Sequence, residues 1–110
     1  MTLGNIDVLE REVTRLYGRI PIWVTEYGYQ TNPPDSVFGV SWARQADYLE
    51  EAFAIAEDDP RITIMLWFLL RDEPDVTRWQ SGLISAGGVR KPAFAAFEET
   101  SAALSAASRR

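Results

Sequence analysis

One stretch decides the fold of this chain: Ile20-Pro21-Ile22-Trp23-Val24-Thr25. It is rich in β-branched and aromatic residues, and a proline is tolerated at the first position of a strand, so a buried strand is predicted over residues 21–25. A second apolar stretch runs from Ile62 to Leu70, and only Thr63 interrupts it. Such a run is typical of a strand that is covered on both faces in a parallel sheet. The sequence therefore predicts two strands, at residues 21–25 and 62–70.

Helical patterns lie before, between and after these strands. Apolar residues recur at intervals of three and four over residues 5–17, 42–56 and 94–104, as on one face of an amphipathic helix. Ser41 is a suitable N-cap for the second helix, and Pro92 suits the first turn of the third. Strands that alternate with helices predict an α/β fold whose strands pair in parallel through right-handed crossovers.

Two long loops, residues 26–40 and 71–90, follow the carboxyl ends of the predicted strands. In α/β barrels and doubly wound sheets, ligands bind on the face that these strand ends form. Loops of this length without secondary structure are usually functional. We therefore expect a site where the two loops meet.

The composition excludes several kinds of chemistry. The 110 residues include no Cys and no His, which excludes Ser-His-Asp and Cys-His catalysis, disulfides and Cys/His zinc sites. The net charge of −5 and the lack of a dense basic stripe argue against nucleic acids and anionic membranes as partners. Carboxylates remain, and 12% of the residues are aromatic. That combination suggests carbohydrate chemistry that needs no metal or cofactor.

Glu26 is the first candidate for a catalytic group. It directly follows the first predicted strand and opens the loop, near Trp23, Tyr27 and Tyr29. A carboxylate at the rim of a sheet among aromatic rings is partly desolvated and faces the cleft. The alternative is a glutamate that caps a helix or forms an ion pair at a strand end. Tyr27 and Tyr29 flank Gly28, and we expect one of their hydroxyl groups to donate to the Glu26 carboxylate.

Further candidates end or follow the second predicted strand. Trp67 offers a flat apolar face to a sugar ring, although a tryptophan packed between sheet and helices is the more common alternative. Asp72 and Glu73 stand just beyond the strand, where they either meet a ligand or are solvated loop charges. Trp79, in the second loop, is either a wall of the cleft or a packing anchor, and the sequence does not decide between them.

Three motifs follow one another along the chain: Pro21-Ile22-Trp23-Val24-Thr25-Glu26-Tyr27-Gly28, then Leu66-Trp67-Phe68, then Trp79-Gln80-Ser81-Gly82-Leu83 with Lys91-Pro92-Ala93-Phe94. Together they resemble the last portion of clan A glycoside hydrolases, the retaining, cellulase-like (β/α)8 barrels. In that clan, a Glu at the carboxyl end of the seventh strand, in contexts such as Thr-Glu-Tyr-Gly, is the nucleophile. The eighth strand often ends with a Trp that lines the sugar subsite, and Lys-Pro-Ala-Phe commonly opens the last helix.

The resemblance implies that Glu26 is the nucleophile and that Trp67 is the platform for a sugar ring. Position adds further candidate substrate contacts, namely Tyr27, Tyr29, Asp72 and Glu73. Residues 5–17 would be the sixth barrel helix, so residues 1–110 would run from about the sixth helix to the eighth. A complete (β/α)8 TIM barrel takes about 250 residues. The chain is therefore expected to be a C-terminal segment of a partial barrel, incomplete as a domain.

The main departure from the family's pattern concerns the second carboxyl group. A retaining mechanism uses two carboxyl groups about 5–5.5 Å apart. In the clan, the acid/base Glu follows the fourth strand, usually after an Asn, and this chain contains no Asn-Glu pair. Asp72 or Glu73 would approach Glu26 across neighbouring strands about 4.8 Å apart, but the family does not use those positions. The resemblance thus implies a glycoside hydrolase whose acid/base is missing here, and an isolated chain that is inactive.

Several expectations about partners and alternatives follow. Two strands and three helices leave sheet edges and one apolar face uncovered, so we expect the missing N-terminal barrel half, or self-association, besides a carbohydrate substrate. One alternative is a non-catalytic carbohydrate-binding or interaction module, in which Trp67→Ala weakens sugar binding and Glu26→Gln does not. Another is a mis-started reading frame without a function of its own. Residues 1–20 do not have the pattern of a signal peptide, so localisation is left open, a secreted parent enzyme included.

Overall fold

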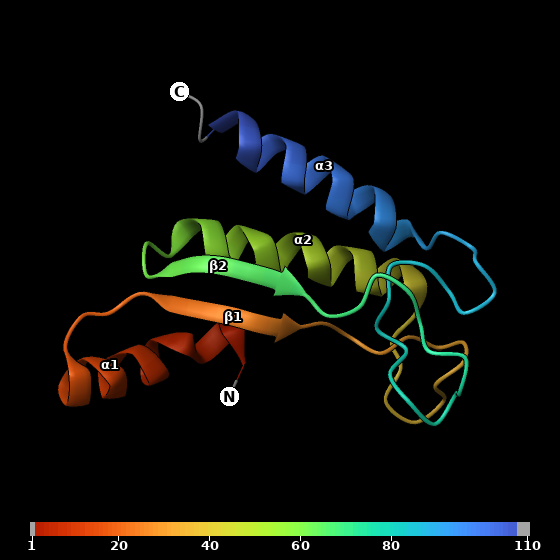
Figure 1. The fold of residues 1–110 in the computed structure, drawn as a ribbon, viewed down its shortest axis with the longest axis horizontal. Helices are drawn as coiled ribbons and strands as arrows, with labels where there is room; N and C mark the ends of the chain where they lie inside the picture. The colour runs from red at the N-terminus through yellow and green to blue at the C-terminus, as the bar shows by residue number, and fades with distance from the viewer. Residues whose placement is uncertain (1, 108–110) are drawn as a thin grey trace.

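The computed structural model describes residues 2–107 and has an α/β fold (Figure 1). Its two strands are parallel neighbours in one sheet, as the alternation of elements predicted. In chain order, the elements are the 3-10 helix η1 (Leu3–Asn5), α1 (Ile6–Tyr17), β1 (Ile22–Tyr27), α2 (Trp42–Asp58), β2 (Ile62–Trp67) and α3 (Pro92–Ala107). No helix within residues 2–107 is long and apolar enough to cross a membrane.

The helices begin where the sequence predicted their starting residues. The Ser41 hydroxyl oxygen accepts a hydrogen bond of 3.2 Å from the backbone N–H of Arg44 and so caps α2. Pro92 occupies the first position of α3, where its missing N–H is no loss. Gly18 ends α1 with a φ of 80°, a conformation that glycine adopts without steric cost.

The pairing of β1 with β2 contains two bulges. Four pairs define the register: Ile22–Ile62, Trp23–Ile64, Val24–Met65 and Tyr27–Trp67. One extra residue lies on β2 between the first two pairs, and one lies on β1 between the last two. A bulge changes the face to which the following side chains point. Because of the second bulge, Val24 and Tyr27 both face α1, while Glu26 lies exposed within a strand that continues two residues beyond its predicted end.

β2 is shorter than predicted. It ends at Trp67, not at Leu70, and the last bond between the strands runs from the Phe68 N–H to the Tyr27 carbonyl at 2.8 Å. Leu69 then adopts a φ of 76°, which turns the chain out of the sheet. The prediction of a strand over 62–70 is wrong at this end, because the backbone beyond residue 69 pairs with a later part of the second loop.

α2 lies at the centre of the packing. One buried cluster consists of Leu49, Phe53, Leu83, Ala93 and Ala96, and another of Leu3, Ala52, Ala56 and Ile62. Met65 of β2 packs against both clusters. The rings of Phe53 and Phe97 meet edge-on with centroids 5.7 Å apart, which joins α2 to α3. The helical pattern predicted over residues 42–56 is therefore confirmed as the core-facing side of α2.

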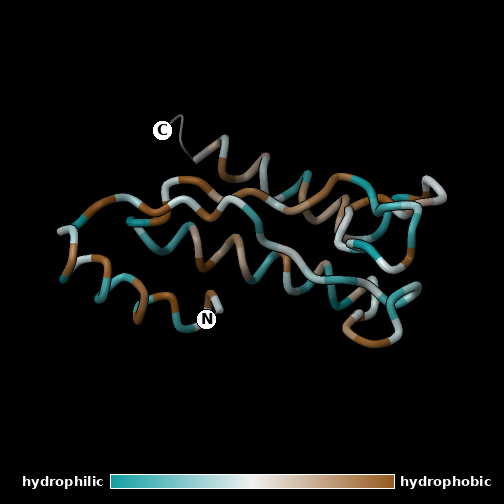
Figure 2. The backbone as a smooth tube through the Cα atoms, turned by 60° about the horizontal axis from the view of Figure 1, so that its bottom comes forward, coloured by the Kyte–Doolittle hydropathy of each residue, from teal (hydrophilic) through white to brown (hydrophobic). Residues whose placement is uncertain are grey.

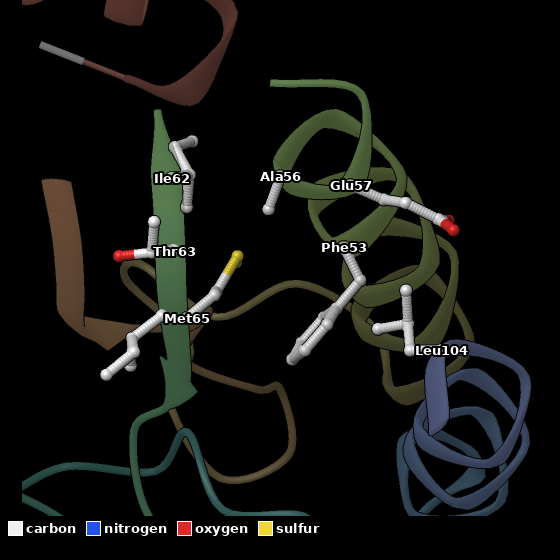
Figure 3. Close-up of a pocket in the computed structure, with 8 residues that line it drawn as sticks. Phe53, Ala56, Glu57, Ile62, Thr63, Met65 and Leu104 are labelled. Atoms are coloured by element: carbon white, nitrogen blue, oxygen red, sulfur yellow. The ribbon is translucent and has the colours of Figure 1, made fainter. Parts of the chain in front are cut away.

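An apolar groove remains beside β2 (Figure 3). Ile62 and Met65 of β2 lie opposite Ala56 and Phe53 of α2, and Leu104 of α3 lies beyond them. This groove is an opening where α3 packs along α2 and not on the strand. Six of its eight lining residues are apolar, and the two polar ones are Glu57 and Thr63.

One face of the sheet and much of α1 are open to solvent. Trp23 is 63% exposed and Leu66 is 51% exposed. Hydrophilic and hydrophobic residues alternate along α1 (Figure 2), yet Leu16 and Tyr17 are also largely exposed. Large exposed apolar surfaces usually mark a contact with another segment or molecule.

A buried arginine holds the amino ends of the strands against α1. The Arg61 side chain is 7% exposed, and its guanidinium donates to the carbonyls of Glu10 (3.0 Å) and Ile20 (3.0 Å) and to the hydroxyl of Thr14 (2.7 Å). The Glu10 carboxylate lies 3.7 Å away. Arg61 therefore fixes α1 to both strands at the end of the sheet opposite the long loops.

Candidate functional site

The two long loops meet at the carboxyl ends of the strands, as Figure 1 shows at the right of the view. We call residues 28–41 the first loop and residues 68–91 the second loop. The Thr31 N–H of the first donates to the Gln80 carbonyl of the second at 3.1 Å. The Gln45 side chain of α2 donates to the carbonyls of Tyr29 (3.1 Å) and Ser81 (3.2 Å) and so holds both loops. The predicted meeting of the loops is confirmed.

A pocket opens between these loops and the end of β1. We name it the Glu26 pocket, and it is lined by Glu26, Tyr27, Gly28, Gln30, Phe68, Trp79 and Ser81. Glu26 is exposed at its mouth. The bulge in β1 just before Tyr27 places the carboxylate here, since bulges at strand ends re-aim side chains.

The aromatic wall of the Glu26 pocket comes from the second loop. The rings of Trp79 and Phe68 meet edge-on, with centroids 5.7 Å apart and an interplanar angle of 89°. Trp79 is 54% exposed, so part of its ring is free to contact a ligand. A flat, exposed indole beside a carboxylate suits the apolar face of a sugar ring and a charge that develops on it.

Close backbone contact forms the floor of the pocket. A Cβ at Gly28 would lie 3.3 Å from the Ser81 Cβ, so the absence of a side chain lets the loops approach. The Ser81 hydroxyl donates to the Phe68 carbonyl at 3.0 Å. These contacts hold the aromatic wall next to the end of β1.

Trp67, the predicted sugar platform, borders the Glu26 pocket, because its ring lies 3.6 Å from the position that a Cβ at Gly28 would occupy. It packs against the buried cluster between the sheet and α2, and its indole N–H donates to the Ser81 carbonyl at 2.9 Å. It is not among the residues that line the Glu26 pocket. The exposed tryptophan of the pocket is Trp79, which the sequence left undecided, because only the path of the second loop reveals which way its ring points.

The two tyrosines bond to each other. The hydroxyls of Tyr27 and Tyr29 are 3.1 Å apart, and the Tyr29 ring also packs against Tyr48, tilted by 43° with centroids 4.7 Å apart. The expected bond from one of them to Glu26 is not formed, because successive residues of a strand point to opposite faces. Burial, together with the Tyr29 hydroxyl, raises the pKa of Tyr27 well above its ordinary value.

The two predicted carboxylates beyond β2 are engaged in other contacts. Asp72 is 3% exposed, accepts from the Gly82 N–H at 2.8 Å and pairs with Lys91 at 2.8 Å. Its burial leaves no access for a ligand from solvent. Glu73 lies 3.4 Å from Arg78 and is outside the pocket lining. Glu26 is thus the single carboxylate that lines the Glu26 pocket in the described chain.

The residues of the site favour chemistry that carboxylates perform. Within residues 2–107, no three His, Cys, Asp or Glu side chains gather so as to hold a metal ion. The carboxyl end of parallel strands is the face on which α/β folds bind ligands, and the Glu26 pocket places a carboxylate and an aromatic wall there.

A family model confirms the class of protein. The model described as the glycosyl hydrolase catalytic core matches residues 4–97. The chain belongs to this family, and the glycoside hydrolase resemblance of the three motifs is confirmed at that level. No curated protein matches the chain.

Three solved β-glucuronidase structures are similar to the chain in fold. The chain is similar to a β-glucuronidase from an uncultured Clostridium sp. (TM-score 0.58, 22% identity), covering 90% of this chain and 20% of that one. It is also similar to the β-glucuronidase of Ruminococcus gnavus (TM-score 0.59, 19% identity), covering 86% and 18%. The β-D-glucuronidase of Dictyoglomus thermophilum matches with a TM-score of 0.59 and 19% identity, covering 91% and 20%.

These similarities concern the fold. The chain spans about a fifth of the length of the solved structures that it matches. Its two parallel strands with flanking helices are similar to part of a TIM-barrel glycosidase.

Proposed function

We propose that the chain is the nucleophile-bearing part of a retaining, clan A glycoside hydrolase barrel and that Glu26 attacks the anomeric carbon of the substrate. The observation that carries this proposal is the Glu26 pocket, where the carboxylate stands at the bulged carboxyl end of β1 beside the exposed ring of Trp79. In this assignment β1 and β2 are the seventh and eighth barrel strands. The helices α1, α2 and α3 are then the sixth, seventh and eighth.

A retaining mechanism requires a second carboxyl group about 5–5.5 Å from the first. Asp72 is buried in an ion pair and Glu73 lies outside the Glu26 pocket, so neither is suited to this role. In the proposal, the acid/base carboxyl comes from a part of the barrel that precedes α1. Glu26 would form a covalent glycosyl ester, and the second group would protonate the leaving oxygen and then activate water.

The proposed substrate is a carbohydrate joined through an O-glycosidic bond, and the reaction needs no cofactor. Trp79 and Phe68 would contact the apolar face of the sugar, while Trp67 supports them from behind through Ser81. This changes the role of Trp67 from a platform to a support. Gln30, which also lines the pocket, offers an amide to the sugar hydroxyls.

The remainder of the barrel is the partner that we propose for the open face of the sheet. Trp23 and Leu66 are exposed there, and a sheet of two strands leaves two unpaired edges. In a closed barrel this face is the packed interior, and it is filled by side chains from the other strands. A second copy of the chain is the alternative occupant.

Product stereochemistry tests the proposed reaction. The full-length protein is incubated with an aryl β-glycoside, and proton NMR follows the first anomer released. The proposal predicts a β-anomer first, and loss of hydrolysis in the Glu26→Gln variant with Glu73→Gln as the matched control. A first-formed α-anomer, or full activity of Glu26→Gln, would contradict it.

A non-catalytic carbohydrate-binding module is the second candidate, because one carboxylate alone lines the Glu26 pocket in the described residues. It predicts that Trp79→Ala weakens sugar binding whereas Glu26→Gln leaves it unchanged. For binding to the 110-residue chain, Trp23→Ala is the matched control, since Trp23 is there a similarly exposed tryptophan outside the pocket. Isothermal titration with a soluble β-linked oligosaccharide measures the binding. Hydrolysis of an aryl β-glycoside by the full-length protein separates the two candidates, because the module binds sugar without cleaving it.

A further inference from the structure

A buried lysine lies directly behind the Glu26 pocket. The side chain of Lys91, the last residue before α3, is 0% exposed. Its Nζ donates to the Thr31 hydroxyl at 2.7 Å, to the Asp72 carboxylate at 2.9 Å and to the Gln80 carbonyl at 3.3 Å. Three acceptors use all three hydrogens of an ammonium group, whereas a neutral amine would supply only two. The cage therefore matches the charged form of the lysine.

Burying the Lys91–Asp72 ion pair costs desolvation free energy, and an apolar pair of similar size would avoid that cost. Burial lowers the pKa of Lys91, and the bond to Asp72 opposes that shift. Replacing a buried ion pair with apolar residues is often neutral or stabilising, so such a pair is weak evidence for stability alone. What the pair does here is join both loops to the start of α3.

Each partner of Lys91 is attached to the Trp79–Ser81 wall, by which we mean residues 79–81. The Gln80 carbonyl accepts from Lys91 and from the Thr31 N–H and hydroxyl. Asp72 accepts from the N–H of Gly82, the next residue after the wall. The ammonium group thus fixes the wall at its centre and at its carboxyl end.

The Gln80 side chain also binds an earlier part of the second loop. Its amide nitrogen donates to the carbonyls of Glu73 (3.1 Å), Asp75 (3.0 Å) and Arg78 (3.3 Å). These bonds wrap residues 73–78 around a side chain that is 1% exposed. The position of Trp79 therefore depends on the position of Gln80, because residues 73–78 are bonded to the Gln80 side chain.

We propose that Lys91 is a positioning residue of the Glu26 pocket: through Asp72, Thr31 and Gln80 it sets the distance between the Trp79 ring and the Glu26 carboxylate. The inference that Lys91 positions Trp79 is drawn from the hydrogen bonds described above. The inference that this position matters for sugar binding rests on the proposed function. Lys91 is not among the residues that line the pocket, so it acts through these neighbours.

The test uses the Lys91→Met/Asp72→Leu double variant, which removes both charges and keeps apolar side chains of similar size. Tryptophans are labelled with fluorine, and fluorine NMR is recorded on the chain together with amide hydrogen exchange. We expect the Trp79 resonance to shift or broaden and the Gly82 amide to exchange roughly tenfold faster or more. The Trp23 resonance, from an exposed tryptophan outside the pocket, is expected to stay unchanged. Because Asp72→Leu itself removes the acceptor of the Gly82 N–H, the Trp79 signal decides, and an unaltered Trp79 signal would overturn the proposal.

A milder variant keeps the test valid if the double variant does not fold. Thr31→Val preserves shape but removes one acceptor of Lys91 and one donor to Gln80. A smaller change of the Trp79 resonance in the same direction is expected, and no change would overturn the proposal.

Kinetics of the full-length protein separate this inference from the proposed function. If both are right, the double variant lowers kcat/KM for an aryl β-glycoside by roughly tenfold or more, because a small misplacement in a site is costly. If Glu26→Gln keeps full activity while the double variant still moves Trp79, the nucleophile assignment fails and the positioning role stands. If Glu26→Gln is inactive while Trp79 is unmoved, the positioning role fails alone.

Discussion

A buried cation stands at each end of the sheet, and the two are held in different ways. Arg61, at the amino end, is bonded mainly to neutral carbonyls and one hydroxyl. Lys91, at the carboxyl end, is bonded to the buried carboxylate of Asp72. The Glu26 pocket, with its exposed aromatic wall and its carboxylate, lies at the carboxyl end.

We infer that the two ends of the sheet have different roles: the amino end stabilises the fold, and the carboxyl end carries the site. In α/β barrels, the amino face of the strands serves stability and the carboxyl face carries the chemistry. Arg61 joins α1 to the strands, which is a packing task. Lys91 joins the two long loops, and we propose that it positions the wall of the Glu26 pocket. Substitutions at the two cations should therefore differ in what they disturb.

Lys91→Met has the largest expected effect. It leaves the Asp72 carboxylate buried without its counter-ion, which costs about 3–5 kcal/mol of unfolding free energy. The measurement is urea denaturation followed by circular dichroism. In the Lys91→Met/Asp72→Leu variant most of that loss should be recovered, so a double variant as unstable as the single one would contradict the ion-pair account.

Arg61→Met should have a smaller effect of a different kind. It leaves carbonyls and one hydroxyl without donors and removes the counter-ion of Glu10, whose side chain is 18% exposed. Because Glu10 keeps some contact with water, we expect a loss of about 1–3 kcal/mol. Hydrogen exchange should become faster in α1, while the fluorine resonance of Trp79 stays unchanged. A shift of the Trp79 signal in Arg61→Met would contradict the inference that Arg61 affects only the packing at the amino end.

Trp79→Ala acts on ligand binding and not on folding. The ring is half exposed, so the unfolding free energy should change little, while affinity for a β-linked oligosaccharide should fall by about tenfold or more. Isothermal titration measures the affinity. Trp67→Phe is the comparison variant, and it should lower stability through the lost bond to Ser81. Unchanged affinity in Trp79→Ala would remove Trp79 from the site.

Tyr27→Phe gives the smallest effect: it removes the bond to Tyr29 at every pH, and its pH-dependent part arises only at high pH. The pKa of Tyr27 is raised in the folded chain above its ordinary value of 10.0, so the folded state holds this proton more tightly than the unfolded state. That contribution to stability is complete below about pH 10 and is lost as the pH rises further. Unfolding free energies of the parent and of Tyr27→Phe, measured from pH 8 to 11, should diverge above about pH 10, the parent falling more steeply. Parallel curves would contradict the raised pKa.

Much of the fold was accessible from the sequence. The order of elements, the parallel pairing, the Ser41 cap and the start of α3 follow from local patterns that tertiary contacts did not override. The position of Glu26 at the loop end of β1 follows from the same patterns. Element ends were less accessible, since the positive φ of Leu69 arises from pairing with the second loop and not from the apolar run itself.

The details of the site depended on features that a linear pattern does not carry. Two bulges decide which face each strand residue occupies, so the packed position of Trp67 could not be read from alternation. Lys91 follows Arg90 in the sequence, and Asp72 precedes Glu73, so both look like solvated loop charges. Their pairing joins residues 19 positions apart and depends on how the second loop folds back.

The most direct test of the central claim, that Glu26 is the nucleophile, is covalent labelling. The full-length protein is treated with a 2-deoxy-2-fluoro glycoside that carries a good leaving group, and the adduct is located by peptide mass spectrometry. The account predicts one glycosyl ester, on the peptide that contains Thr25-Glu26-Tyr27, and none in Glu26→Gln. An ester on any other carboxylate, with Glu26 unmodified, would contradict it.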